Sequence, residues 1–147
     1  MCTVIREATV QDMDSVFAMA KDLATSFDVK YEAFCASFNE VLNTSNAFLL
    51  VAEKNKVVVA YLLGFEHTAF YANGRVSWVE EVYVNPRYRK EGLGRLLMNA
   101  FEKGAKQHSS KLVALSTRRA GDFYESLGYE ASATYYKKTF EKVSEIT

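Results

Sequence analysis

The stretch that most constrains this chain runs from Ser77 to Leu97, where a strand-like segment is followed by a glycine-containing loop and a helical pattern. The first part is rich in β-branched and aromatic side chains, as strands are. Asn85-Pro86 ends that pattern, because proline cannot donate to a sheet ladder. From Leu93 onward, apolar residues recur at the spacing of one helix face. A glycine-containing loop at a helix start favours an anion, because the backbone can approach it closely and the first helical N–H groups lack partners.

The composition limits the class of protein. With 147 residues the chain is expected to form one domain, residues 1–147, with a sizeable core. Lys+Arg and Asp+Glu are both 18, which argues against a large basic surface for nucleic acid. Two cysteines and two histidines show no four-ligand spacing, so no metal site is predicted. Because no membrane-length apolar run or signal pattern is present, we expect a cytoplasmic protein with no membrane or nucleic-acid partner.

The order of predicted elements indicates a mixed α/β domain around one sheet. Helices are predicted over residues 10–24, 31–42, 93–108 and 120–127. Strands are predicted over residues 3–7, 47–53, 57–65, 77–84 and 111–116, followed by a closing hairpin of 129–134 with 135–140. The residues after this hairpin are expected to fray.

Two common nucleotide-binding motifs do not fit the loop. A P-loop needs GxxxxGK[ST], and no such run is present. A dinucleotide-binding fold needs GxGxxG in an early βαβ unit, whereas this loop follows several strands and reads RxxGxG.

Two linked motifs instead resemble the GNAT superfamily of N-acetyltransferases. The first is Arg89-x-x-Gly92-x-Gly94, between a strand and a helix. The second is Ala120-x-x-Phe123-Tyr124-x-x-Leu127-Gly128-Tyr129, in the matching place downstream. The order of elements also agrees over nearly the whole chain. The resemblance implies the GNAT fold, a central and mostly antiparallel sheet flanked by helices.

The resemblance implies acetyl-CoA as co-substrate. Its pyrophosphate would be held at the helix start by the motif arginine and by the backbone N–H groups that follow it. The residues concerned are Arg89, Lys90, Glu91, Gly92, Leu93, Gly94 and Arg95. Its pantetheine arm would pair with backbone groups of Val82, Tyr83 and Val84, one of which would polarise the thioester carbonyl. Thr117 stands where the family has an asparagine that contacts the cofactor, so it keeps a hydroxyl but loses the amide.

The same resemblance suggests the catalytic groups. Tyr124 occupies the family's usual position for the acid that protonates the departing thiolate. A base is needed as well, because an alkyl amine with a pKa of about 10 is mostly protonated at neutral pH. Glu80 and Glu81 are the candidates, and alternation places them on opposite faces unless a bulge disturbs the strand. Glu80 is slightly preferred, because it resembles the strand carboxylate of polyamine acetyltransferases.

The resulting hypothesis is an acetyl-CoA-dependent N-acetyltransferase that acts on a primary amine of a small molecule or peptide. Two alternatives stay open: a CoA-binding regulatory or sensor module without catalysis, and an enzyme that transfers a longer acyl chain. Homodimerisation is common in the family and is expected on that ground.

Overall fold

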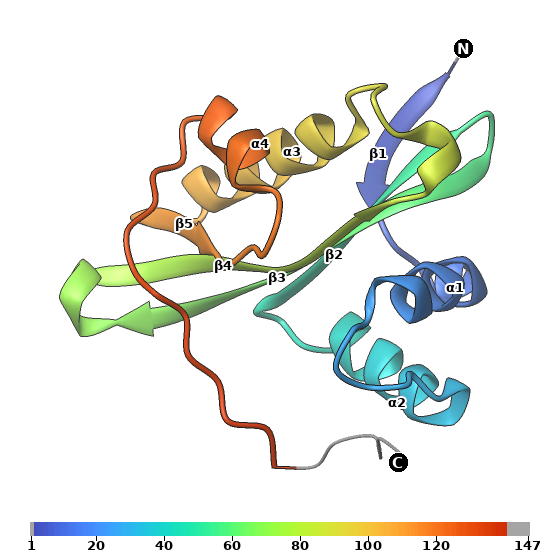
Figure 1. Ribbon diagram of the computed structural model, residues 1–147, viewed down its shortest axis with the longest axis horizontal. Helices are drawn as coiled ribbons and strands as arrows, with labels where there is room; N and C mark the ends of the chain where they lie inside the picture. The colour runs from blue at the N-terminus through green and yellow to red at the C-terminus, as the bar shows by residue number, and fades with distance from the viewer. Residues whose placement is uncertain (1, 141–147) are drawn as a thin grey trace.

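A computed structural model describes residues 2–140 as a five-stranded sheet in the order β1-β2-β3-β4-β5, with helices on both faces (Figure 1). The strands are β1 (Thr3–Glu7), β2 (Ala47–Lys54), β3 (Val57–Ala69), β4 (Gly74–Val84) and β5 (Leu112–Leu115). The helices are α1 (Met13–Leu23), α2 (Tyr31–Leu42), α3 (Leu93–Gln107) and α4 (Gly121–Ser126), with short 3-10 turns at Val10–Asp12, Phe70–Ala72 and Pro86–Tyr88. Within the described residues, no helix is long and apolar enough to cross a membrane.

The sheet is mostly antiparallel, as predicted, with one parallel pair at its end. β1 to β4 pair antiparallel with their neighbours, while β5 pairs parallel to β4. The β4–β5 register runs only from Val76↔Leu112 to Val79↔Leu115. The second half of β4, from Glu80 onward, therefore has β3 on one side and, within residues 2–140, no strand on the other.

A β-bulge lies at the point where β5 ends. Leu63 of β3 faces Glu81, but the next residue, Gly64, faces Val79, so Glu80 is an extra residue on β4. Gly64 is required here, because a Cβ at this position would lie 2.5 Å from a ring carbon of Phe101 on α3. The missing side chain lets α3 pack directly over the bulge.

Each face of the sheet has its own core, and Figure 1 shows α3 and α4 on one side and α1 and α2 on the other. The α3 side is built around Leu62, Leu97 and Met98, which are fully buried. On the α1–α2 side, Tyr61, Val51 and Phe38 are among the buried residues. Both faces of β3 and β4 are thus covered, which makes the bulged region a rigid support.

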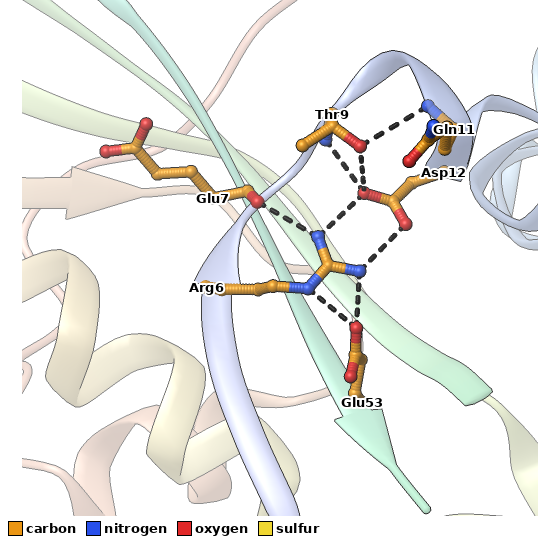
Figure 2. Close-up of polar contacts among 6 residues, drawn as sticks. All are labelled: Arg6, Glu7, Thr9, Gln11, Asp12 and Glu53. Carbon is orange, nitrogen blue, oxygen red and sulfur yellow. Dashed lines mark hydrogen bonds and ion pairs between the residues drawn. The ribbon is translucent and has the colours of Figure 1, made fainter. Parts of the chain in front are cut away.

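An ion-pair network joins β1 to the start of α1 (Figure 2). The Arg6 guanidinium donates to both carboxylate oxygens of Asp12, at 2.8 and 2.9 Å, and its Nε donates to Glu53 at 2.7 Å. Asp12 also accepts from the backbone N–H of Thr9 and so completes a capping box at the start of the helical segment. These contacts lower the pKa of Asp12, chiefly through the hydrogen bond from Arg6.

The predicted closing hairpin is wrong. No strand forms between residues 129 and 140, and no backbone hydrogen bond joins residues 130–140 to the rest of the described chain. The segment contacts the α1–α2 loop through Lys137, whose Nζ lies 2.8 Å from Ser26 Oγ. Alternating side chains alone do not make a strand, because a ladder also requires an edge that accepts the segment. The expectation that the last residues fray falls on residues 141–147, outside the described range.

Candidate active site

A cavity of about 410 Å³ opens where β4 loses its β5 partner. It lies between the end of β4, the loop that leads into α3, and α4. Its lining residues are Val82, Tyr83, Val84, Arg89, Lys90, Gly92, Leu93, Gly94, Arg95, Ala120, Phe123 and Tyr124. The cavity therefore combines a free strand edge, a helix start and an aromatic wall.

The strand side of the cavity provides backbone polar groups. Val82 to Val84 lie opposite Leu62 to Ala60 of β3, while the other edge of β4 at these residues has no neighbouring strand among residues 2–140. Open strand edges hydrogen-bond readily to extended ligands that carry amides.

The loop before α3 exposes a row of N–H groups. The Asn85 side chain accepts from the N–H of Arg87 at 2.9 Å and starts the turn. Lys90 (φ 71°) and Gly92 (φ 84°) then take left-handed conformations, and only glycine adopts these without strain. Among residues 2–140, the N–H groups from Lys90 to Arg95 have no protein acceptor, and the first donor from this region is Leu96, to Gly92. Such a turn can hold an anion.

Two side chains hold this loop in place. Arg89 donates from Nε to the carbonyl of Val84 at 2.8 Å, and its guanidinium carbon lies 5.2 Å from the ring centre of Tyr83. Glu91 forms an ion pair with Lys54 at the end of β2. Because Glu91 points to Lys54, its side chain is not part of the cavity lining.

Tyr124 has a different environment from the other tyrosines near the site. Its ring packs edge-on against Phe123 and Tyr129, with ring centres 4.9 and 6.0 Å apart. Burial raises the pKa of Tyr124 above its usual value, so the phenol stays protonated at neutral pH. Its hydroxyl has no hydrogen-bond partner among residues 2–140, whereas Tyr129 donates to Glu102 at 2.5 Å. The proton of Tyr124 is therefore available to a ligand.

The two carboxylates on β4 lie outside the cavity lining. Glu80, at the bulge, is exposed and accepts from the indole N–H of Trp78 at 3.0 Å. Glu81 is half-buried and accepts from the hydroxyl of Tyr61 at 2.7 Å. Neither aromatic partner was identified from the sequence, because both lie in apolar strands whose composition reads as core.

The structure places most of the sequence-predicted cofactor residues around one cavity. Glu91 and Thr117 are the exceptions. The Thr117 hydroxyl accepts from the N–H of Ala120 at 3.0 Å, and Thr117 does not line the cavity. Ala120 and Phe123 belong to the second motif but are not among the predicted site residues, although both line the cavity. A Cβ on Gly94 would lie 3.3 Å from the Phe123 ring, which explains how α3 and α4 approach so closely.

Comparisons with known proteins agree with this site. The profile of the Acetyltransferase (GNAT) family matches residues 12–129. The chain is 31% identical over 139 residues to an aminoalkylphosphonate N-acetyltransferase of Salmonella typhimurium, covering 91% of this chain and 89% of that protein. It is also 27% identical over 93 residues to an uncharacterised N-acetyltransferase, YhfO, of Bacillus subtilis, covering 60% of this chain and 62% of that one.

Solved structures share the fold. Glucosamine-6-phosphate N-acetyltransferase from Arabidopsis thaliana superposes with a TM-score of 0.85 at 21% identity, over 96% of this chain and all of that one (100%). The aminoglycoside N-acetyltransferase AAC(6')-Iy in complex with CoA superposes with a TM-score of 0.81 at 19% identity, over 93% and 95% of the two chains. From its motifs, its sheet and these relatives, the chain belongs to the acetyltransferase (GNAT) family and is an N-acetyltransferase.

Proposed function

We propose that this enzyme transfers the acetyl group of acetyl-CoA to a primary amine of a small molecule or peptide by direct attack. One observation carries the proposal: around a single cavity lie a strand edge, a row of N–H groups and a tyrosine hydroxyl, none of which has a partner among the described residues. Each of these features matches a different part of such a reaction.

The residues present suit acetyl-CoA. The N–H groups from Lys90 to Arg95 belong to a segment that lines the cavity, as do the cationic side chains of that segment, a combination that suits a pyrophosphate. The free edge of β4 at Val82–Val84 suits the amides of a pantetheine arm, and an N–H there would polarise a thioester carbonyl. The co-substrate supplies the activated acetyl group, which is reactive because a thiolate is a good leaving group.

The protein's own groups would move protons on both sides of the reaction. Glu80 or Glu81 would take a proton from the acceptor ammonium, directly or through water, and leave the nitrogen lone pair free. Tyr124 would donate its proton to the departing sulfur. Because the pKa of Tyr124 is raised, the phenol stays protonated until negative charge develops on the departing sulfur. The side chains of Thr117 and Glu91 have no part in holding the co-substrate in this proposal, since both are engaged elsewhere.

The acceptor is proposed only as a class. The Salmonella relative is named for aminoalkylphosphonates, and the match covers 89% of that protein. Small aminoalkylphosphonates are therefore the first acceptors to test, together with diamines, amino sugars and peptides with free amino termini.

Thermal-shift measurement tests the co-substrate. A ligand at about 100 times its dissociation constant adds roughly 2.7 kcal/mol to the free energy of unfolding. We expect acetyl-CoA and CoA to raise the melting temperature, while ATP at equal concentration serves as the nucleotide control. If neither CoA species raises it, the co-substrate assignment is wrong.

Turnover tests the reaction itself. The amine panel is incubated with acetyl-CoA, and released thiol is measured against a reaction without amine. Amine-dependent thiol release is the expected result. If the protein binds CoA but releases no thiol with any amine, the sensor module is favoured instead. If thiol is released faster from a longer acyl-CoA than from acetyl-CoA, transfer of the longer acyl chain is favoured.

We also propose a homodimer. The support is the C-terminal segment, where Tyr135, Tyr136 and Phe140 are 59%, 88% and 93% exposed. Aromatic residues exposed to this degree are typical of protein interfaces. Sedimentation of the wild type and of the Tyr136→Ser, Phe140→Ser double variant tests this. A monomeric wild type at micromolar concentration contradicts the proposal.

A further inference from the structure

β4 carries two neighbouring carboxylates, and residue type alone does not decide which one takes the proton of the acceptor. Regular alternation would send them to opposite faces. The bulge interrupts this alternation. Glu80 is the extra residue, and Glu81 is back in register opposite Leu63, so alternation no longer distinguishes the two carboxylates. What separates the two carboxylates is the partner of each.

The partner of Glu81 belongs to the rigid core. Tyr61 lies on β3, is 1% exposed and packs in the cluster beneath α1 and α2. It pairs across the sheet with Tyr83, and its hydroxyl reaches diagonally to Oε1 of Glu81 at 2.7 Å. A buried phenol needs a hydrogen-bond partner, and here that partner is the carboxylate. The orientation of Glu81 is therefore set by a side chain that cannot easily move.

This hydrogen bond also has a fixed direction. Burial, followed by the charge of Glu81, raises the pKa of Tyr61 well above its usual range. Tyr61 therefore stays protonated at neutral pH and acts as the donor. A donor to the charged form stabilises a carboxylate, and Oε2 keeps both lone pairs for an ammonium or a water.

Glu80 lacks this support. It is exposed at the bulge, and its partner Trp78 lies only two residues away on the same strand. An exposed carboxylate keeps much of its rotamer freedom and its hydration. Proton transfer in a transition state depends on a positioned group, so the geometry favours Glu81.

We propose that Glu81 takes the acceptor's proton and that Tyr61 is a positioning residue, fixing the Glu81 carboxylate from within the core. The inference rests on the proposed acetyl transfer. In the step concerned, an N–H bond of the ammonium breaks, an O–H bond forms at Oε2 of Glu81, and the electron pair stays on nitrogen. The proton then leaves to solvent.

The neighbouring ionisable groups do not offer the same support. Glu80 adjoins Glu81 on β4. On the α1–α2 side, Tyr83 donates to Asp22 of α1, so Asp22 already has a partner. Lys21 and Lys30, at the α1–α2 connection, both pair with Asp28.

The test uses two matched variants, each removing one donor from one carboxylate. Tyr61→Phe removes the donor to Glu81, and Trp78→Phe removes the donor to Glu80. The pH dependence of kcat/KM is measured for the best amine at saturating acetyl-CoA. In Tyr61→Phe we expect the acidic limb to move to higher pH, because the carboxylate loses a hydrogen-bond donor to its charged form. We also expect kcat to fall about tenfold, with KM for acetyl-CoA unchanged. Trp78→Phe should leave the limb in place.

Other outcomes overturn the inference. If Trp78→Phe moves the limb and Tyr61→Phe does not, Glu80 is the base. If neither moves it, Tyr61 has no positioning role. If calorimetry shows that Tyr61→Phe does not fold, Glu81→Gln and Glu80→Gln are compared instead. The inference then requires Glu81→Gln to lower kcat by about two orders of magnitude more than Glu80→Gln does. If the wild type acetylates no amine, the proposed function itself is wrong. If the wild type is active but the acidic limb does not move in Tyr61→Phe, only this inference is wrong.

Discussion

Replacing Tyr124 by phenylalanine separates catalysis from stability. Its hydroxyl has no hydrogen-bond partner among residues 2–140, so the variant loses no internal hydrogen bond. We expect the free energy of unfolding to change by less than about 0.5 kcal/mol. If the hydroxyl protonates the departing sulfur, however, the rate of acetyl transfer must fall.

The size of that fall follows from the local environment. General acids contribute about 10²–10⁴-fold, and the contribution is greatest when the acid is stronger than the group it protonates. Burial raises the pKa of Tyr124 above its usual 10, while a thiol has a pKa of about 8.5. Proton transfer from Tyr124 is therefore not downhill, and we expect the low end, about 10²-fold in kcat/KM, or about 2.7 kcal/mol.

Tyr129→Phe is the matched control, five positions along the chain. Tyr129 donates to Glu102 at 2.5 Å in a part-buried contact, so its loss should destabilise the protein by about 1 kcal/mol. That change lowers the melting temperature by about 3 °C and should leave most of the activity intact.

Both variants are measured by calorimetry and by thiol release at saturating amine. The expected pattern is reciprocal: Tyr124→Phe is stable and slow, and Tyr129→Phe is less stable and active. A Tyr124→Phe enzyme with more than half of the wild-type kcat/KM would falsify the acid assignment. A Tyr124→Phe enzyme that is both slow and strongly destabilised would show that the hydroxyl has a structural partner.

Three further predictions concern the loop and the β1–α1 network. Gly94→Ala places a Cβ 3.3 Å from Phe123 in the cavity wall, so we expect KM for acetyl-CoA to rise about fivefold, measured by initial rates. Gly92→Ala meets no atom within 4 Å but has φ of 84°, so we expect about 1 kcal/mol lower stability in urea unfolding and a smaller rise in KM. Arg6→Gln should cost about 2 kcal/mol at pH 7. Because the pKa of Asp12 is lowered in the folded state, the unfolded chain binds more protons, and this stabilisation is present above about pH 4 and lost below it. The difference between wild type and Arg6→Gln should therefore shrink as the pH falls from about 5 to 2, and a constant difference would contradict the assignment.

Much of the architecture could be predicted because it depends on local chemistry. The α3 face and the Asn85-Pro86 break each rest on contacts within a few residues, and each appears where predicted. The RxxGxG loop belongs to the same group, since its left-handed turn at Gly92 is a property of the glycine itself.

The closing hairpin fails for the opposite reason. Residues 129–140 have the composition of strands, but a strand exists only where another edge receives it, and no part of the described chain does so. His108, at the end of α3, likewise has a partner that no local sequence pattern predicts. In the fold it lies 2.9 Å from the buried carboxylate of Glu66, which comes from β3, 42 positions earlier.

The sequence by itself determined the family, the order of elements up to α4 and the glycine-containing loop before α3, because two short motifs and their spacing carry that information. Only the tertiary structure decided how the two candidate carboxylates, Glu80 and Glu81, are supported. The bulge at Glu80 depends on register between β3 and β4, and the Tyr61–Glu81 hydrogen bond joins residues 20 positions apart. Such pairings arise from packing between strands and helices, and packing is not encoded in any local pattern.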